Sequence, residues 1–237
     1  TPEAEQPVPA YSWYALGVLV LVYELNFIDR QILSILANDI KADLNVDDAY
    51  IGFLYGTAFA VFYSLFGIPL GKVADSWKRV RLLAIGLTLW STMTALSGFA
   101  KNAGTLAVAR MGVGVGEATA SPSAYSLISD WFPARLRATA LAIYSSGLYI
   151  GGGVSLLIGA YIVDGGPGGI VGWQAAFLSV GIPGVLLALW VSTLKEPKRG
   201  AIDDIETPED PAPFAGFFRE LLQVIPPFTL LGAFQRG

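Results

Sequence analysis

The sequence predicts an all-α membrane protein in which residues 12–194 form a bundle of six membrane-spanning helices. The chain is 54% hydrophobic and 14% charged, whereas a soluble domain usually carries about 25% charged residues. Six apolar stretches, each near the roughly 20 residues that a helix needs to cross a bilayer, recur between short polar connections. Composition and segment length together therefore indicate that the lipid bilayer surrounds most of this chain.

The absence of cysteine and histidine narrows the function. None of the 237 residues is Cys or His, which rules out disulfides, thiolate or imidazole metal sites and His-dependent catalytic triads. No Gly-x-Ser-x-Gly nucleophile elbow occurs either, so a membrane hydrolase is disfavoured. The net charge of −4, without a basic stripe, argues against a nucleic-acid partner. We expect no enzyme activity, no cofactor and no metal.

The first three predicted helices are bounded by charged connections. The first, residues 12–36, follows a tail of residues 1–11 that lacks the positively charged start of a signal peptide. An acidic connection separates it from the second helix, residues 51–74. A basic loop then leads to the third helix, residues 82–100.

The next three predicted helices cover residues 105–131, 138–163 and 173–194. Pro69, Pro122 and Pro183 lie inside the second, fourth and sixth helices, where each should kink the helix or free a backbone carbonyl.

The basic residues predict the orientation, because cytoplasmic loops of membrane proteins carry an excess of Lys and Arg. The connections after the first, third and fifth helices contain only Lys41 and Lys101, beside acidic residues. We therefore expect a cytoplasmic N-terminus and a location in the cell inner (plasma) membrane. The basic residues that follow the even-numbered helices are Lys72, Lys78, Arg79, Arg81, Arg135, Arg137, Lys195, Lys198 and Arg199.

After the sixth helix the composition changes. Residues 195–213 are rich in Pro, Asp and Glu and predict a solvated cytoplasmic linker. Residues 214–224 place Phe and Leu at helical spacing opposite polar residues, which indicates an amphipathic helix at the membrane surface. Residues 225–237 are apolar but too short to span, and we interpret them as the start of a seventh helix. We expect a second half outside this sequence.

Charged residues inside the apolar stretches give the first indication of function. Arg110 and Glu117 are seven residues apart on the fourth helix, about 10 Å along one face. Asn26, Asp29 and Arg30 share one face of the first helix at an overlapping depth. Because a charge in hydrocarbon is costly unless it is paired, we predict the pairs Arg30–Glu117 and Asp29–Arg110.

These pairs could lock two helices together, or they could line a transport path and exchange partners. Ionisable residues inside membranes are usually functional, which favours the second interpretation. Our hypothesis is that Asp29 and Glu117 carry protons while Arg30 binds an anionic group of the substrate.

The loop after the second helix resembles the signature loop of the major facilitator superfamily, through Gly71, Asp75 and Arg79. In that family the loop latches the two halves of the transporter in the outward-facing state, so the resemblance implies this role for these three residues. It also implies a fold of two six-helix halves, each made of 3+3 inverted repeats, that works by alternating access as a monomer when full length.

Further motifs resemble the spinster branch of this superfamily and look bacterial. Its animal members are associated with export of sphingosine-1-phosphate and lysophospholipids, so the resemblance implies an amphipathic anion as substrate. Asn26, Arg30 and Arg110 would bind its charged part, and aromatic residues would form the apolar walls. The motifs are 26–30, 110–118, 130–132 with Arg135 and Arg137, and 195–197 with Arg199 and Gly200; the wall candidates are Tyr55, Phe59, Phe62, Tyr63, Tyr125, Tyr144 and Tyr149.

Two alternatives stay open. Arginine–carboxylate pairs would serve equally well in a proton-coupled carrier of small organic anions or drugs. A membrane receptor that binds such a ligand without moving it is also compatible with the sequence, and only measured flux would separate it from a transporter.

Overall fold

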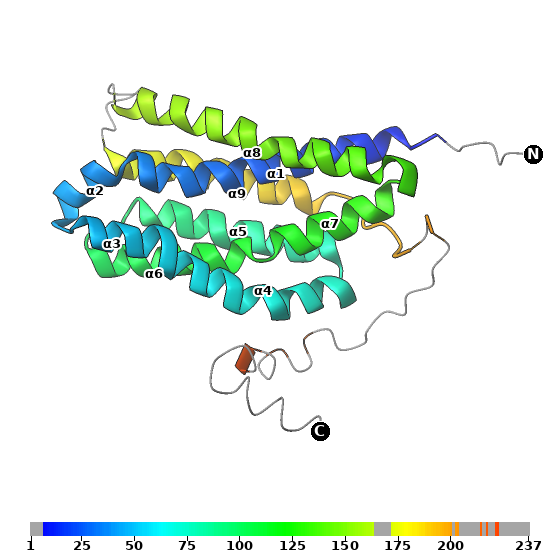
Figure 1. The fold of residues 1–237 in the computed structure, drawn as a ribbon, viewed down its shortest axis with the longest axis horizontal. Helices are drawn as coiled ribbons and strands as arrows, with labels where there is room; N and C mark the ends of the chain where they lie inside the picture. Colours follow the sequence, from blue (N-terminus) through cyan, green and yellow to red (C-terminus); the bar gives the residue numbers. More distant parts are fainter. Residues whose placement is uncertain are drawn as a thin grey trace, which may run out of the picture.

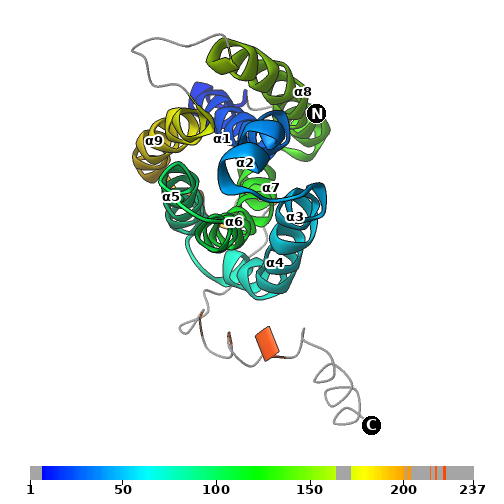
Figure 2. The same cartoon turned by 90° about the vertical axis from the view of Figure 1, so that its left-hand side faces the viewer.

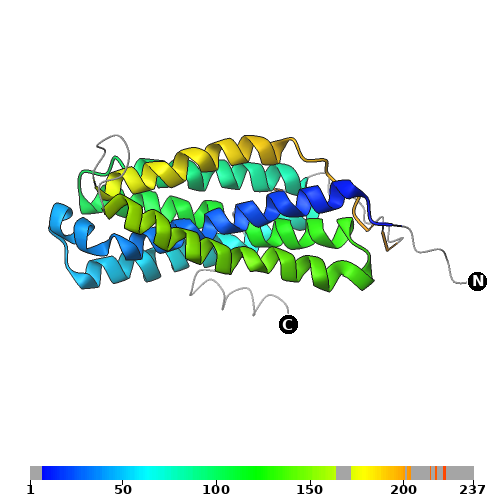
Figure 3. The same cartoon turned by 90° about the horizontal axis from the view of Figure 1, so that it is seen from above.

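The computed structural model describes residues 7–163, 172–200, 202–203, 214, 217 and 221–222. Within these residues the chain is helical and contains no strand. The long helices lie side by side along one axis, as the two side views show (Figures 1 and 3). In chain order they are α1 (Ala10–Ile35), α2 (Ala37–Leu44), α3 (Asp48–Gly52), the π-helix η1 (Phe53–Ala58), α4 (Phe59–Ser76), α5 (Arg79–Ser97), α6 (Ala103–Glu117), α7 (Ala120–Trp131), α8 (Ala134–Val163) and α9 (Trp173–Ser192).

The end-on view shows how the helices group (Figure 2). Helix α1 packs against α8 and α9, while α5 packs against α9 on one side and α6 on the other. Helix α4 packs against α6 at the edge of the bundle. The buried apolar core includes Trp90, Phe177 and Leu19, each at most 1% exposed.

The two ends of the bundle differ in charge. The basic end carries the start of α1 and the end of α9, and it holds the basic residues Lys72, Lys78, Arg79, Arg81, Arg135, Arg137 and Lys195. The acidic end carries α2 and the connection to α3, with Asp39, Asp43, Asp47 and Asp48. The described connections α1–α3, α4–α5, α5–α6 and α7–α8 therefore fall on the ends predicted from the charge pattern.

Among the residues that the structure describes, five helical segments are long and apolar enough to cross a membrane: Ala10–Ile35, Asp48–Ser76, Arg79–Ser97, Ala134–Ala160 and Trp173–Ser192. They correspond to five of the six predicted spans, so the chain is a multi-pass membrane protein. The predicted second helix is longer than expected and includes the π-helix η1. Gly52 and Gly56 lie beside and within η1.

The predicted fourth helix over residues 105–131 is interrupted, in agreement with the kink expected from Pro122. The structure has two shorter helices, α6 of 15 residues and α7 of 12 residues, interrupted at Ala118 and Thr119. Pro122 explains the position of the break, because proline has no N–H and its ring clashes with the carbonyl four residues earlier, that of Ala118. By contrast, Pro69 and Pro183 are accommodated inside α4 and α9.

The glycines between Arg110 and Glu117 allow close helix packing, as expected. A Cβ on Gly116 would lie 2.7 Å from the Gly86 carbonyl oxygen and from the Trp90 nitrogen on α5. A Cβ on Gly114 would lie 2.8 Å from the Phe59 carbonyl oxygen on α4. These distances are too short for any side chain, so α6 is held against α4 and α5 through bare backbone.

Part of the predicted C-terminal organisation can be placed. Phe214 packs edge-on against Trp77 with ring centroids 5.2 Å apart, and the Phe217 and Phe66 centroids are 6.4 Å apart. Both phenyl rings therefore contact the end of α4. Leu221 and Leu222 are also described and helical, whereas the other residues of the predicted amphipathic helix, most of the linker and the predicted start of a seventh helix lie outside the described residues.

Replacement of Gly116 tests the packing of α6 against α5. Gly116→Ala should lower the free energy of unfolding by about 1–3 kcal/mol, because its methyl group would overlap backbone atoms. Thermal unfolding in detergent measures the change. Gly153→Ala is the matched control, since a Cβ there meets no atom within 4 Å. Equal effects of the two substitutions would contradict the proposed close approach.

Candidate functional site

Two ion pairs join α1 to α6 in the middle of the bundle. The Arg30 Nε and Nη2 atoms each lie 2.8 Å from Oε2 of Glu117. The Arg110 Nη1 atom lies 3.2 Å from Oδ2 and 3.3 Å from Oδ1 of Asp29. Both predicted pairings are thus confirmed.

The two pairs differ in burial. The side chains of Asp29 and Arg110 are 1% and 2% exposed, so this pair is enclosed. The side chain of Glu117 is fully buried, but that of Arg30 is 34% exposed. Arg30 is therefore the one charge of the four that can meet a ligand without rearrangement of the helices.

Sequence reasoning missed a second partner of Asp29. Thr94 of α5 is buried, and its hydroxyl donates a hydrogen bond of 2.8 Å to Oδ1 of Asp29. The available signal was the three-residue spacing of Ser91, Thr94 and Ser97, which places their hydroxyls on one face of the helix. This contact brings α5 into the charged centre beside α1 and α6.

A cavity of about 90 Å³ lies beside the Arg30–Glu117 pair. It has room for several water molecules. The Arg30 guanidinium contributes a positive charge to the cavity. The other polar groups of the lining include the Asn26 amide and the Ser121 hydroxyl. Five helices contribute the lining, which consists of Tyr23, Asn26, Phe27, Arg30, Tyr63, Glu117, Ala120, Ser121 and Leu148.

Two aromatic rings cover the Arg30 guanidinium. Its Cζ atom lies 4.6 Å from the centroid of Phe59 and 5.2 Å from that of Tyr63. Both distances are within the range of a cation–π interaction, which stabilises a charge that has lost part of its water. Phe59 and Tyr63, both predicted as wall residues, thus contact the charged centre.

The other predicted wall residues lie elsewhere. Tyr55 on η1 and Tyr149 on α8 are 47% and 79% exposed, and neither lines this cavity. Tyr125 packs edge-on against Tyr144 with centroids 5.7 Å apart, and Tyr144 stacks on the cavity residue Tyr23 at 4.6 Å. Tyr125 and Tyr144 therefore form a second layer behind the lining, on α7 and α8.

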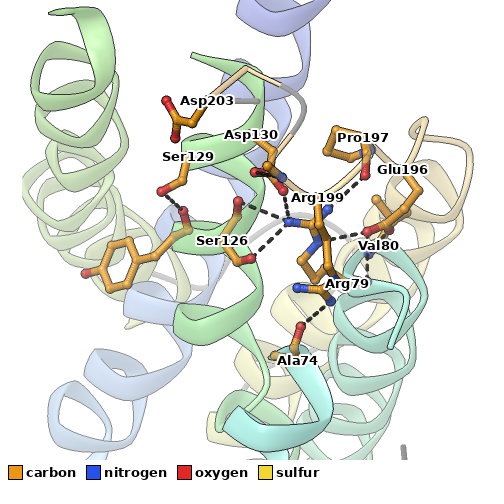
Figure 4. Close-up of polar contacts among 12 residues, drawn as sticks. Ala74, Arg79, Val80, Ser126, Ser129, Asp130, Glu196, Pro197, Arg199 and Asp203 are labelled. Carbon is orange, nitrogen blue, oxygen red and sulfur yellow. Dashed lines mark hydrogen bonds and ion pairs between the residues drawn. The ribbon is translucent and has the colours of Figure 1, made fainter. Parts of the chain in front are cut away.

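A separate network occupies the basic end around Arg79, which is fully buried (Figure 4). Its guanidinium pairs with Asp130 of α7 and, at 2.8 Å, with Glu196 after α9. It also donates to the Ser126 hydroxyl at 3.0 Å and to the Pro197 carbonyl at 2.9 Å.

The segment after α9 binds the ends of three helices. The Glu196 carboxylate accepts the Val80 N–H at 2.8 Å, at the N-terminus of α5, where the helix dipole favours a negative charge. Arg199 donates to the Ala74 carbonyl at 2.6 Å, and the Gly200 N–H donates to Asp130 at 3.0 Å (Figure 4). Burial and the neighbouring Arg79 charge lower the pKa of the Arg199 guanidinium.

Of the three predicted latch residues, only Arg79 lies in this network. Arg79 is the centre of the network, whereas Asp75 is exposed and is not among the partners of Arg79. A Cβ on Gly71 would meet nothing within 4 Å. The Arg79 partners Asp130 and Glu196 lie in the motifs that resemble the spinster branch, but nothing in their spacing predicts that both bind Arg79.

Comparison with known proteins matches residues 19–235 to the Major Facilitator Superfamily. The chain belongs to the major facilitator superfamily. It is 36% identical over 188 residues to an MFS-type efflux pump of Mycolicibacterium smegmatis, covering 79% of this chain and 43% of the relative. It is 30% identical over 194 residues to a probable galactarate/D-glucarate transporter of Bacillus subtilis, covering 79% and 41%.

The spinster resemblance is confirmed by solved structures. A bacterial homologue of the human lysosomal transporter spinster, in an inward-facing and unoccupied conformation, superimposes with a TM-score of 0.76 at 35% identity. The alignment covers 90% of this chain and 49% of that protein. This superfamily member therefore spans about half, or less, of the length of the relatives that it matches.

Thr94 should position the Asp29 carboxylate. Thr94→Val keeps the shape but removes the donor, and should lower the free energy of unfolding by about 1–2 kcal/mol. Thr94→Ser restores a hydroxyl and should recover most of that loss. Thermal unfolding of the wild-type protein and the two variants measures this change in stability. Equal stability of the Val and Ser variants would show that the hydrogen bond to Asp29 contributes nothing.

Glu196 should stabilise the basic end. Glu196→Gln keeps the size of the side chain but removes the charge beside Arg79, and should destabilise the protein by about 1–3 kcal/mol. Asp203→Asn is the control, because the Arg137–Asp203 pair is 27% and 38% exposed and should contribute about 1 kcal/mol or less. Chemical unfolding compares the stability of the two variants with that of the wild-type protein. A larger loss of stability in Asp203→Asn than in Glu196→Gln would refute the stabilising role of Glu196.

Proposed function

We propose that this bundle is the first half of a proton-coupled secondary transporter that moves an anionic substrate by alternating access. The observation that carries the proposal is the Arg30–Glu117 pair, in which the arginine is partly exposed in a polar cavity and the carboxylate is buried. Alternating access needs two halves that move about a central site, so the transport cycle belongs to the full-length protein.

The pair suggests how a proton and an anion are coupled. Deprotonated Glu117 holds Arg30 through two hydrogen bonds. Protonation of Glu117 removes its charge, so Arg30 becomes free to bind the anionic group of a substrate. Conversely, an anion bound to Arg30 replaces the charge that Glu117 supplied, which allows Glu117 to remain neutral in a low-dielectric site.

Asp29 is the second proposed proton carrier. Its partners Arg110 and Thr94 are both buried, so a proton that reaches Asp29 breaks an enclosed pair rather than one that faces a cavity. Because Asp29 and Arg30 are adjacent on α1, a shift of this helix changes both pairs together. This arrangement supports a coupling between protonation and helix movement.

The substrate that we favour carries an anionic head group. An amphipathic lipid such as a lysophospholipid is consistent with the spinster relatives, and a hydroxylated organic acid is consistent with the galactarate/D-glucarate transporter. The Asn26 amide and the hydroxyls of Tyr23, Tyr63 and Ser121 beside Arg30 suit the head of either class. Uptake of lysophosphatidate and of D-glucarate by the full-length protein in liposomes distinguishes the two, and binding without flux would indicate a receptor.

Orientation and latch follow the same proposal. The basic end would face the cytoplasm of a bacterial cell, with the protein in the inner membrane. Gly71, Asp75 and Arg79 would contact the second half in the outward-facing state. The burial of Arg79 among Asp130 and Glu196 supports a part in keeping the basic ends of α4, α5 and α7 together when that contact opens.

Glu117→Gln tests the proton role in the full-length protein reconstituted in liposomes. Uptake driven by a pH gradient should fall at least tenfold, because Gln cannot exchange a proton, while exchange of substrate between the two sides should persist. Glu24→Gln, a half-buried carboxylate on α1 outside the cavity lining, is the control and should retain gradient-driven uptake. Unchanged gradient-driven uptake in Glu117→Gln would reject proton coupling through this residue.

A further inference from the structure

The Asn26 side chain is buried, and among the described residues it has no hydrogen-bond partner. Asn26 is 4% exposed and lines the central cavity together with Arg30. Its amide carries an N–H₂ donor and an oxygen acceptor. A buried polar group that stays unpaired is costly, and such groups are normally satisfied by protein, water or a ligand. The cavity is therefore where the amide finds its partner.

Asn26 and Arg30 are placed so that one head group can reach both. They are four residues apart on α1, which puts them on one face of the helix, about 6 Å apart along its axis. Both line the same cavity of about 90 Å³. Two polar groups on neighbouring atoms of a small molecule, each with its own hydrogen bond, span a separation of this size.

The rest of the lining adds neutral polar groups rather than further positive charge. Ser121 on α7 lines the cavity, and its hydroxyl has no hydrogen bond to another described residue. Tyr23 and Tyr63 also line it. The one positive charge in the lining is that of Arg30, and it is already paired with the buried Glu117 carboxylate. The lining thus suits a head group with a single anionic group and neutral polar groups beside it.

A hydroxyl group fits the Asn26 amide better than a charged group does. Because a hydroxyl both donates and accepts, it can pair with either end of the amide. An ammonium group would be repelled by Arg30, one turn away. A second carboxylate beside the first would add a negative charge that the single arginine cannot neutralise in a low-dielectric site. A hydrocarbon group would leave the amide unpaired.

We propose that Asn26 selects substrates that carry a hydroxyl group beside their anionic group. The anionic group binds Arg30, and the neighbouring hydroxyl binds the Asn26 amide. Sugar acids and lysophospholipids with a free glycerol hydroxyl share this chemistry. The inference rests on the proposed anion transport and adds the feature by which one anion is preferred to another.

Two matched pairs of anions test this selection by calorimetry on the full-length protein in detergent. D-Glucarate is compared with adipate, the same dicarboxylate chain without hydroxyls, and lysophosphatidate is compared with its analogue that lacks the glycerol hydroxyl. The wild-type protein is measured beside Asn26→Leu, which keeps the size of the side chain without its donor and acceptor. Gln31→Met is the matched control, because it removes an amide from α1 outside the cavity lining.

In the wild-type protein the hydroxylated member of at least one pair should bind at least about tenfold more tightly. The pair that shows this preference identifies the source of the head group as a sugar acid or a lipid. Asn26→Leu should reduce the preference to less than about twofold by weakening binding of the hydroxylated anion, whereas Gln31→Met should preserve it. The thermal unfolding midpoint of Asn26→Leu should not fall, since the amide binds no other described protein group.

Equal affinities within both pairs, with binding lost in Arg30→Ala, would overturn the selection by Asn26 and leave the proposed anion transport intact. A preference that Asn26→Leu retains would also overturn it. A clear fall in the unfolding midpoint of Asn26→Leu would assign the amide to the fold instead of the substrate. Failure of the wild-type protein to bind any of the four anions would overturn both the selection and the proposed anionic substrate.

Discussion

Four charges buried between apolar helices are tolerable only as neutral pairs, and this constraint organises the centre of the molecule. Arg110 and Asp29 enclose each other between α6 and α1, and Thr94 adds a contact from α5. Arg30 and Glu117 lie on the same two helices, beside the cavity. Because Asp29 and Arg30 are neighbours on α1, neither pair can form in register unless the other does. The depth of α6 relative to α1 is thus set by charge.

The close approach of the helices serves the same purpose. The glycines of α6 bring its backbone against α4 and α5, which fixes the position of Glu117, and the Arg30 side chain reaches it from α1. The break after Glu117 then ends α6 at the depth of the cavity and starts α7 there. A single interruption therefore positions a carboxylate and a helix N-terminus at one place, which a continuous helix would not do.

The basic end is held by a second, independent set of charges. Arg79 is fully buried there, and its partners come from α7 and from the segment after α9. The same segment reaches the end of α4 through Arg199. The central pairs are suited to exchange partners because one member faces a cavity. The Arg79 network is suited to hold helix ends together because Asp130 and Glu196 bind both its charge and adjacent backbone N–H groups.

The sequence by itself determined the membrane class, five of the six spans, the two ion pairs and the superfamily. These depend on local composition and on helical spacing, which fix depth and face without knowledge of the neighbours. Only the tertiary structure decided that Thr94 binds Asp29, that Asp130 and Glu196 meet at Arg79, and that Tyr55 and Tyr149 lie away from the cavity. Such contacts depend on how separate helices rotate against each other. The break at Ala118 lies between these cases: Pro122 marked it, but only the structure shows that the Thr119 hydroxyl turns back to the Gly116 carbonyl.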